Sequence, residues 1–236
     1  MTVARVEGSA LSSLRPPRAL VFDWDNTLVD SWGTIHDALN FLMEAMERPL
    51  WTIEETRERV RLSLRDAFPT IFGDRWEEAR QIYIDRFRAI HLDRLTPLPG
   101  CEAMLRTLAA DGHYLAVVSN KTGAVLRSEA AHLGWSSFFG SIVGAGDCHA
   151  DKPHCAPVEL ALQPSGIKPG SDVWFVGDTA VDMECALASG CVPVLFGASA
   201  SSDEFTQFPP VLTVADGAAL FHVLQGLRSV PARPSS

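Results

Sequence analysis

The stretch VFDWDNTLVDS, residues 21–31, places two carboxylates one residue apart directly after an apolar run. Residues 19–23, ALVFD, predict a short buried strand whose carboxyl end opens to solvent. Like charges at such a position repel each other, and burial penalises both of them. Asp and Asn are also common turn residues, so a simple polar turn is an alternative interpretation. Other motifs in the chain are needed to distinguish a polar turn from a functional site.

Composition narrows the classes of function. The 236 residues carry 29 acidic and 20 basic side chains, a net charge of −9, which argues against a nucleic-acid-binding face. No apolar run approaches the roughly 20 residues that cross a bilayer, and residues 1–20 lack the apolar core of a secretory signal. The five cysteines form no dense framework, which fits a reducing cytosol. We expect a cytoplasmic protein with neither nucleic acid nor membrane as partner; the oligomeric state stays open.

Short apolar runs alternate with helical patterns along most of the chain. Further strands are predicted at 113–119, 141–146, 172–178, 191–197 and 210–214. Helical spacing occupies 100–112, 122–135 and 181–190, and each of these segments ends at or next to a glycine. This alternation predicts an α/β fold with a Rossmann-like parallel sheet and helices on both of its faces.

Residues 32–96 interrupt the alternation, because helical segments follow one another there without a strand. One segment opens with Thr52 and Glu55 in capping-box positions and continues as a helix to residue 68. The next segment has Asp74 as its expected N-cap. The domain boundaries that follow are a disordered tail at 1–17, a core at 18–31 and 97–226, an all-helical insert at 32–96 and a loose tail at 227–236.

The polar motifs all follow predicted strands. They are Asp23 and Asp25 after the first strand, Ser119 and Asn120 after the second, Lys152 after the third, and Asp178 and Asp182 after the fourth. In open parallel sheets, ligands bind beyond the carboxyl ends of the strands. We therefore expect these side chains to share one crevice.

Several carboxylates and one ammonium group in a common crevice favour a hard divalent ion, most simply Mg²⁺. We expect Asp23 and Asp178 to supply ligand oxygens and Asp182 to hold a metal-bound water. Asp23 would attack phosphorus as a nucleophile, and Asp25 would serve as general acid and base. A phosphoryl group would then lie between the metal and Lys152.

Four motifs carry a resemblance to a known family. DWDNT (23–27), VVSN (117–120), DKP (151–153) and GDTAVD (177–182) resemble, in order and spacing, the signature motifs of the haloacid dehalogenase-like hydrolase superfamily. The helical insert is similar to the small helical cap of that family. LVDS after the first motif and PLPG after the insert resemble its phosphoglycolate phosphatase-like branch.

The resemblance implies a role for each motif residue. It makes Asp23 the nucleophile and Asp25 the acid and base, with the carbonyl of Asp25 also binding Mg²⁺. It makes Ser119 and Lys152 catalytic phosphate binders and Asp178 and Asp182 metal-site residues. Trp24, Asp25 and Asn120 are also expected to contact the phosphate.

Two positions depart from the family pattern. Asn26 stands where the family has glycine, and Asn tolerates left-handed backbone better than most residues. Trp24 is bulkier than the usual aliphatic residue, and we expect it to narrow the pocket. Neither change removes a catalytic group.

The favoured function is a Mg²⁺-dependent phosphatase that hydrolyses a small phosphorylated metabolite through an aspartyl-phosphate. A phosphomutase or a dehalogenase on the same fold, or an inactive relative that binds a partner protein, are the alternatives. One further cluster stays open: Cys148, His149, His154 and Cys155 lie close in sequence, but their spacing matches no common zinc finger or ribbon. Ordinary loop residues are the favoured interpretation there.

Overall fold

The computed structural model describes residues 14–60, 62–197 and 203–228. Its central sheet has six strands in the order β5-β4-β1-β6-β7-β8, and all the pairings are parallel. The strands are β1 (Ala19–Phe22), β4 (Tyr114–Thr122), β5 (Ser141–Ala145), β6 (Val173–Gly177), β7 (Val192–Phe196) and β8 (Leu212–Val214). The predicted α/β class with a Rossmann-like sheet is confirmed.

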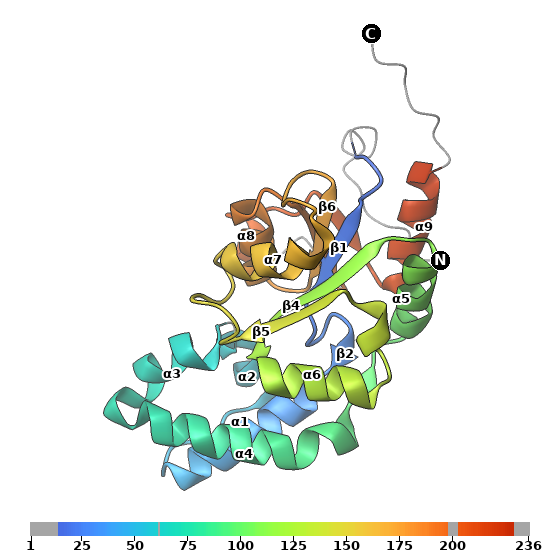
Figure 1. The fold of residues 1–236 in the computed structure, drawn as a ribbon. Coiled ribbons are helices and arrows are strands. Elements are labelled where there is room, and N and C mark those ends of the chain that lie inside the picture. The colour runs from blue at the N-terminus through green and yellow to red at the C-terminus, as the bar shows by residue number, and fades with distance from the viewer. Residues whose placement is uncertain (1–13, 61, 198–202, 229–236) are drawn as a thin grey trace.

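Alternation along β1 gives the sheet two apolar faces. Leu20 and Phe22 belong to one buried cluster, and Ala19 and Val21 belong to another. Helices α5 (Cys101–Ala110), α6 (Gly123–His132) and α9 (Gly217–Arg228) cover the first face, and α7 (Ala156–Leu162) and α8 (Ala180–Ala188) cover the second. Figure 1 shows these two helical layers around the sheet. Short 3₁₀ turns occupy Ser136–Phe138, Gln163–Ser165 and Asp203–Phe205.

Between β1 and β4 lies a group of four helices, which we call the cap. They are α1 (Trp32–Ala45), α2 (Ile53–Arg59), α3 (Leu64–Phe72) and α4 (Trp76–Arg94), with a 3₁₀ turn at Gly73–Arg75. The cap has its own apolar core, which includes Leu39, Phe68 and Phe87. Figure 1 shows the four helices gathered at one end of the sheet. None of the helices in the described part of the chain is long and apolar enough to span a bilayer.

The chain enters and leaves the cap side by side. Strand β2 (Val29–Asp30) pairs antiparallel with β3 (Thr96–Pro97), and Val29 lies opposite Pro97. The backbone N–H of Leu98 also donates to the carbonyl of Leu28, at 2.9 Å. The two linkers therefore form a short hydrogen-bonded ribbon at the base of the cap.

The capping box at Thr52 is present, but residues 52–68 do not form one helix. Helix α2 ends at Arg59, and Val60 has extended backbone. A new N-terminus follows, where Ser63 is the N-cap of α3 and its hydroxyl donates to Asp66, at 2.9 Å. Ser at an N-cap and Asp in a first turn both favour starting a helix, which explains the break.

Asp74 is not the N-cap of the last cap helix. It lies inside the 3₁₀ turn, which runs directly into α4 with Arg75 at the junction. Because the backbone is already turning at Asp74, no free helix end is left there for its carboxylate to cap.

The predicted N-terminal tail lies partly within the described chain. Leu14 packs against the main core, the buried cluster that contains Leu20 and Phe22. The carbonyl of Pro17 lies 3.0 Å from Nδ1 of His113. At the other end, α9 extends to Arg228, past the predicted boundary at 226. The remaining predicted tail residues, 1–13 and 229–236, lie outside the described residues.

Candidate active site

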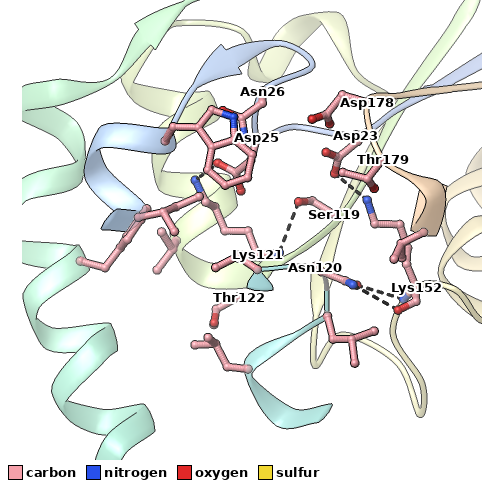
Figure 2. A pocket seen from close by; sticks show the side chains of 18 of the residues that line it. Asp23, Asp25, Asn26, Ser119, Asn120, Lys121, Thr122, Lys152, Asp178 and Thr179 are labelled. Atoms are coloured by element: carbon pink, nitrogen blue, oxygen red, sulfur yellow. Dashed lines mark hydrogen bonds and ion pairs between the residues drawn. The ribbon is translucent and has the colours of Figure 1, made fainter. Parts of the chain in front are cut away.

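A cavity of about 130 Å³ lies between the carboxyl ends of the central strands and the cap. Its lining includes six of the predicted site residues: Asp23, Asp25, Ser119, Asn120, Lys152 and Asp178. Figure 2 shows these side chains converging from separate segments of the core. At about 30 Å³ for each water of the liquid, this volume corresponds to roughly four waters, so it fits only a small ligand.

Three carboxylates gather on one side of this cavity. Asp23 follows β1, Asp178 follows β6, and Asp182 lies in the first turn of α8; one oxygen of each lies within 4.8 Å of the others. Burial raises the pKa of Asp23 to about 7; Asp182 and Asp25 add to the rise, and Lys152 opposes it. Burial, together with Asp182 and Asp23, also raises the pKa of Asp178. This excess of negative charge fits a divalent cation with oxygen ligands.

Lys152 is the cation that the core places in this cluster. Its Nζ lies 2.6 Å from Asp23 and 2.7 Å from Asp182, and its side chain is 4% exposed. Burial alone would lower the pKa of Lys152, but Asp182 and Asp23 outweigh it and raise the pKa above the usual value. Lys152 therefore stays charged beside the candidate nucleophile.

Asn120 fixes the backbone that carries Lys152. Its side-chain N–H donates to the carbonyl of Lys152 at 3.1 Å, and its side-chain oxygen accepts from the N–H of Lys152 at 3.0 Å. Figure 2 shows this pair of hydrogen bonds. Asn120 lines the cavity, but its side-chain oxygen is committed to the lysine. The Oγ of Ser119 accepts from the N–H of Lys121 at 3.3 Å and keeps its own proton to donate.

Asp182 joins Lys152 to helix α8. One of its oxygens pairs with Lys152, and the other accepts from the N–H and the hydroxyl of Thr179, at 3.0 and 2.7 Å, in a capping box. A Cβ on Gly177 would lie 2.4 Å from the Cβ of Asp182, so the close approach of helix and strand requires glycine. The role of Asp182 in holding a metal-bound water stays a prediction.

The turn after Asp25 has the expected geometry. Asn26 has φ of +62°, in the left-handed region, and its side-chain oxygen accepts from the N–H of Ser31 at 3.2 Å. Thr27 donates to Asp178 at 3.0 Å. The turn therefore orients a carboxylate that follows β6 as well as the two that follow β1.

A second charged cluster, which the sequence did not predict, surrounds Asp25. Lys121 lies 2.6 Å from Asp25 and 2.7 Å from Glu129, a carboxylate on α6 that is 1% exposed. Nδ1 of His91, from the cap, lies 2.8 Å from the other oxygen of Glu129, and the indole of Trp24 donates to Glu129 at 2.7 Å. Burial lowers the pKa of Lys121, but Asp25 and Glu129 outweigh it and raise the pKa overall. Burial raises the pKa of Glu129, but His91 and Lys121 keep it below the usual value.

Comparisons with known proteins agree with this geometry. The family model described as haloacid dehalogenase-like hydrolase matches residues 20–195, well over half of the chain. The chain belongs to this family of hydrolases. It is 29% identical over 194 residues to the phosphoglycolate phosphatase of Chromobacterium violaceum, covering 78% of this chain and 87% of that protein. It is 30% identical over 190 residues to that of Pectobacterium atrosepticum, covering 77% and 80%.

A solved structure shares the fold. The protein from Haemophilus somnus described as a predicted phosphoglycolate phosphatase superimposes with a TM-score of 0.76 at 21% identity, covering 88% of this chain and 98% of that one. The haloacid dehalogenase-like family and the phosphoglycolate phosphatase-like branch, both predicted from the motifs, are therefore confirmed, and the chain is an enzyme of the hydrolase class.

In this hydrolase, the Trp24 side chain does not line the cavity. It is fully buried in the main core, where its ring contacts Trp135 edge-on at 5.8 Å between centroids. The expectation that Trp24 narrows the pocket is therefore wrong, and only its backbone is available to a phosphate. The reason is the alternation along an extended chain, which sends Trp24 away from Asp23 and Asp25.

Two signals in the sequence point to the missed residues. Strand β4 continues to Thr122, three residues beyond the predicted end, so Lys121 follows Ser119 with the period of a strand. Glu129 lies three residues after Leu126 and next to Ala130, on the buried face of α6. A carboxylate on an apolar face needs a buried partner, and that requirement indicates a cation nearby.

The Cys and His residues at 148–155 form no metal cluster. The thiol of Cys148 donates to the carbonyl of Ala150 at 2.9 Å, and the rings of His149 and His154 meet edge-on. Across residues 14–60, 62–197 and 203–228, the Asp23, Asp178 and Asp182 trio is the one group of such side chains with ligand spacing. The interpretation of these four side chains as ordinary loop residues stays a prediction.

Proposed function

We propose that this hydrolase is a Mg²⁺-dependent phosphatase, which cleaves a small phosphomonoester through an aspartyl-phosphate on Asp23. The observation that supports this most directly is the group of three carboxylates with Lys152 held 2.6 Å from Asp23. The ion would be held by Asp23, Asp178 and the carbonyl of Asp25. Asp182 would hold a metal-bound water. When bound, Mg²⁺ would neutralise charge on the phosphoryl oxygens and on the carboxylates.

In the first step, an oxygen of Asp23 attacks phosphorus. A bond forms from Asp23 to phosphorus while the bond from phosphorus to the ester oxygen breaks. Asp25 donates a proton to the departing oxygen, so the alcohol leaves neutral. Lys152 and Ser119 would bind the phosphoryl oxygens during this transfer.

In the second step, water hydrolyses the aspartyl-phosphate. Asp25, now ionised, removes a proton from a water as that water attacks phosphorus, and the bond to Asp23 breaks to release inorganic phosphate. Lys121 occupies one oxygen of Asp25 at 2.6 Å and so leaves the other for these proton transfers. Asp25 therefore returns to its starting state after each turnover.

The substrate and setting that we propose are a small phosphorylated metabolite in the cytoplasm. The net charge of −9 and the acidic cavity disfavour nucleic acid as a ligand. The small cavity volume also disfavours a macromolecular substrate.

Hydrolysis of p-nitrophenyl phosphate, with Mg²⁺ and with EDTA, tests the proposal. We expect turnover only with the metal, and loss of turnover in Asp23→Asn with the fold retained, as checked by circular dichroism. After a rapid acid quench, wild type should carry a phosphoryl group that hydroxylamine removes, and Asp23→Asn should not. Activity retained in Asp23→Asn would refute the nucleophile.

The same preparation distinguishes the alternative functions. Metal-independent release of halide from a haloacid would favour a dehalogenase, and transfer of phosphate to a sugar would favour a mutase. No turnover of any ester with Mg²⁺ would favour a partner-binding relative. Each of these results would replace the phosphatase.

A further inference from the structure

The cavity has two unlike halves. The core supplies the carboxylates, Lys152 and Ser119, whereas the cap supplies uncharged side chains from α1, α4 and the loop between α2 and α3. They include Trp32, Leu62, Tyr83, Ile84 and Phe87. The phosphate of a bound ester would lie against the core half, so its alcohol portion would face the cap half.

The cations near the cavity are already paired. Lys121 and Lys152 are the two cationic side chains in the described lining, and each contacts two carboxylates within 2.7 Å. Phe87 also faces the Nζ of Lys121, at 4.8 Å from the ring centroid. A negatively charged leaving group would therefore meet no unpaired cation among these side chains.

Three arginines of the cap are paired outside the lining, and Arg57 lies over the ring of Trp32, at 5.6 Å from its centroid. Arg65 pairs with Asp151 at 2.9 Å, and Arg86 and Arg94 both pair with Asp37. None of the described arginines of the cap is part of the cavity lining. Arg61 lies outside the described residues, and the inference uses only the side chains above.

We propose that the preferred substrate has an uncharged, apolar leaving group, such as a branched alkyl or an aryl-methyl alcohol. This inference rests on the proposed phosphatase function. An apolar group would replace water against Ile84 and Phe87, whereas a carboxylate there would lose hydration with no cation among the described cap side chains of the lining to pair with. Phosphoglycolate, for which the curated relatives are named, carries such a carboxylate. This enzyme would therefore discriminate against it.

A matched pair of esters tests the inference. Benzyl phosphate and 4-carboxybenzyl phosphate have similar leaving alcohols and differ in one remote carboxylate. With Mg²⁺, we expect kcat/KM at least about tenfold higher for benzyl phosphate, because the remote carboxylate would be desolvated against the cap half without a paired cation. Phosphoglycolate should likewise be a poorer substrate than 3-methylbutyl phosphate.

Two variants connect the preference to the cap. Leu62 lines the cavity and is 45% exposed, so the fold should tolerate Leu62→Arg. This variant should raise kcat/KM for the carboxylated ester relative to kcat/KM for benzyl phosphate. Leu50, also in the cap and 60% exposed, does not line the cavity, so Leu50→Arg is the matched control and should leave the ratio unchanged. The role of the cap half would be refuted if Leu62→Arg left the ratio of the two kcat/KM values unchanged. It would also be refuted if Leu50→Arg shifted that ratio equally.

The outcomes separate this inference from the proposed function. If wild type hydrolyses both esters equally, or prefers the carboxylated one or phosphoglycolate, the apolar leaving group is refuted while the phosphatase stands. If no ester is hydrolysed with Mg²⁺, the phosphatase itself is refuted, and this inference fails with it.

Discussion

Metal and proton should compete for Asp23. Burial raises the pKa of Asp23 to about 7, against an ordinary value of 3.8, so the folded protein without metal holds a proton that the unfolded chain has lost. Stability without metal should therefore fall as the pH rises from about 4 to about 7. Mg²⁺ has to displace that proton at pH 5.5 but meets an ionised Asp23 at pH 8, so its stabilising effect should be larger at pH 8.

The size of the effect follows from these two pKa values. At pH 5.5 the folded state binds nearly one more proton at Asp23 than the unfolded state, and at pH 8 it binds almost none. With 1.36 kcal/mol for each pKa unit, Asp23 contributes about 2 kcal/mol less to the free energy of unfolding at pH 8 than at pH 5.5. Glu129, whose pKa is lowered, is ionised in both states throughout this range, so it contributes no opposing slope.

Urea unfolding at the two pH values, with Mg²⁺ and with EDTA, measures this contribution in wild type and in Asp23→Asn. Because Asp23 also raises the pKa of Asp178, the difference between the two proteins measures Asp23 together with its effect on Asp178. In EDTA, wild type should lose about 2 kcal/mol more than the variant between pH 5.5 and pH 8. The same slope in both proteins, or an equal gain from Mg²⁺ at both pH values, would refute the competition.

Three further predictions follow from the contacts. Asp25→Asn should slow hydrolysis by about 10²-fold or more for esters of poor leaving groups and less for p-nitrophenyl phosphate; equal slowing for both esters in steady-state assays would contradict the acid role. Lys121→Met leaves Asp25 and Glu129 without their shared cation and should cost about 3–5 kcal/mol in urea unfolding, whereas Lys168→Met, on the surface, should change stability by less than about 0.5 kcal/mol. Gly177→Ala forces Asp182 away from β6, and it should lower both kcat and the midpoint of thermal unfolding; wild-type values of both would show that the contact relaxes freely.

The central sheet was predictable because each strand ends where an apolar run meets Asp, Asn, Ser or Gly. The position of Asp23, Ser119 and Asp178 around one cavity follows from the same pattern, since parallel strands share a carboxyl edge. The orientation of Trp24 also follows from strand alternation, which directs its side chain away from Asp23 and Asp25 and into the buried core.

Other features depend on contacts between segments far apart in sequence. Glu129 pairs with His91, a cap residue 38 positions earlier in the sequence, and the pair forms only when the cap packs against α6. The division between α2 and α3 depends on Ser63 and Asp66, which compete with the helical pattern of their neighbours. Local patterns contain each residue in these cases, but they do not determine its partner.

The antiparallel pairing of β2 with β3 has a consequence for how such enzymes diversify. Val29 lies opposite Pro97, so the 67 intervening residues begin and end at neighbouring points of the same scaffold. Exchanging that segment for another of different sequence would leave the spacing of Asp23, Lys152 and Asp178 unaltered. Selectivity and bond-breaking chemistry can thus evolve on separate parts of one polypeptide.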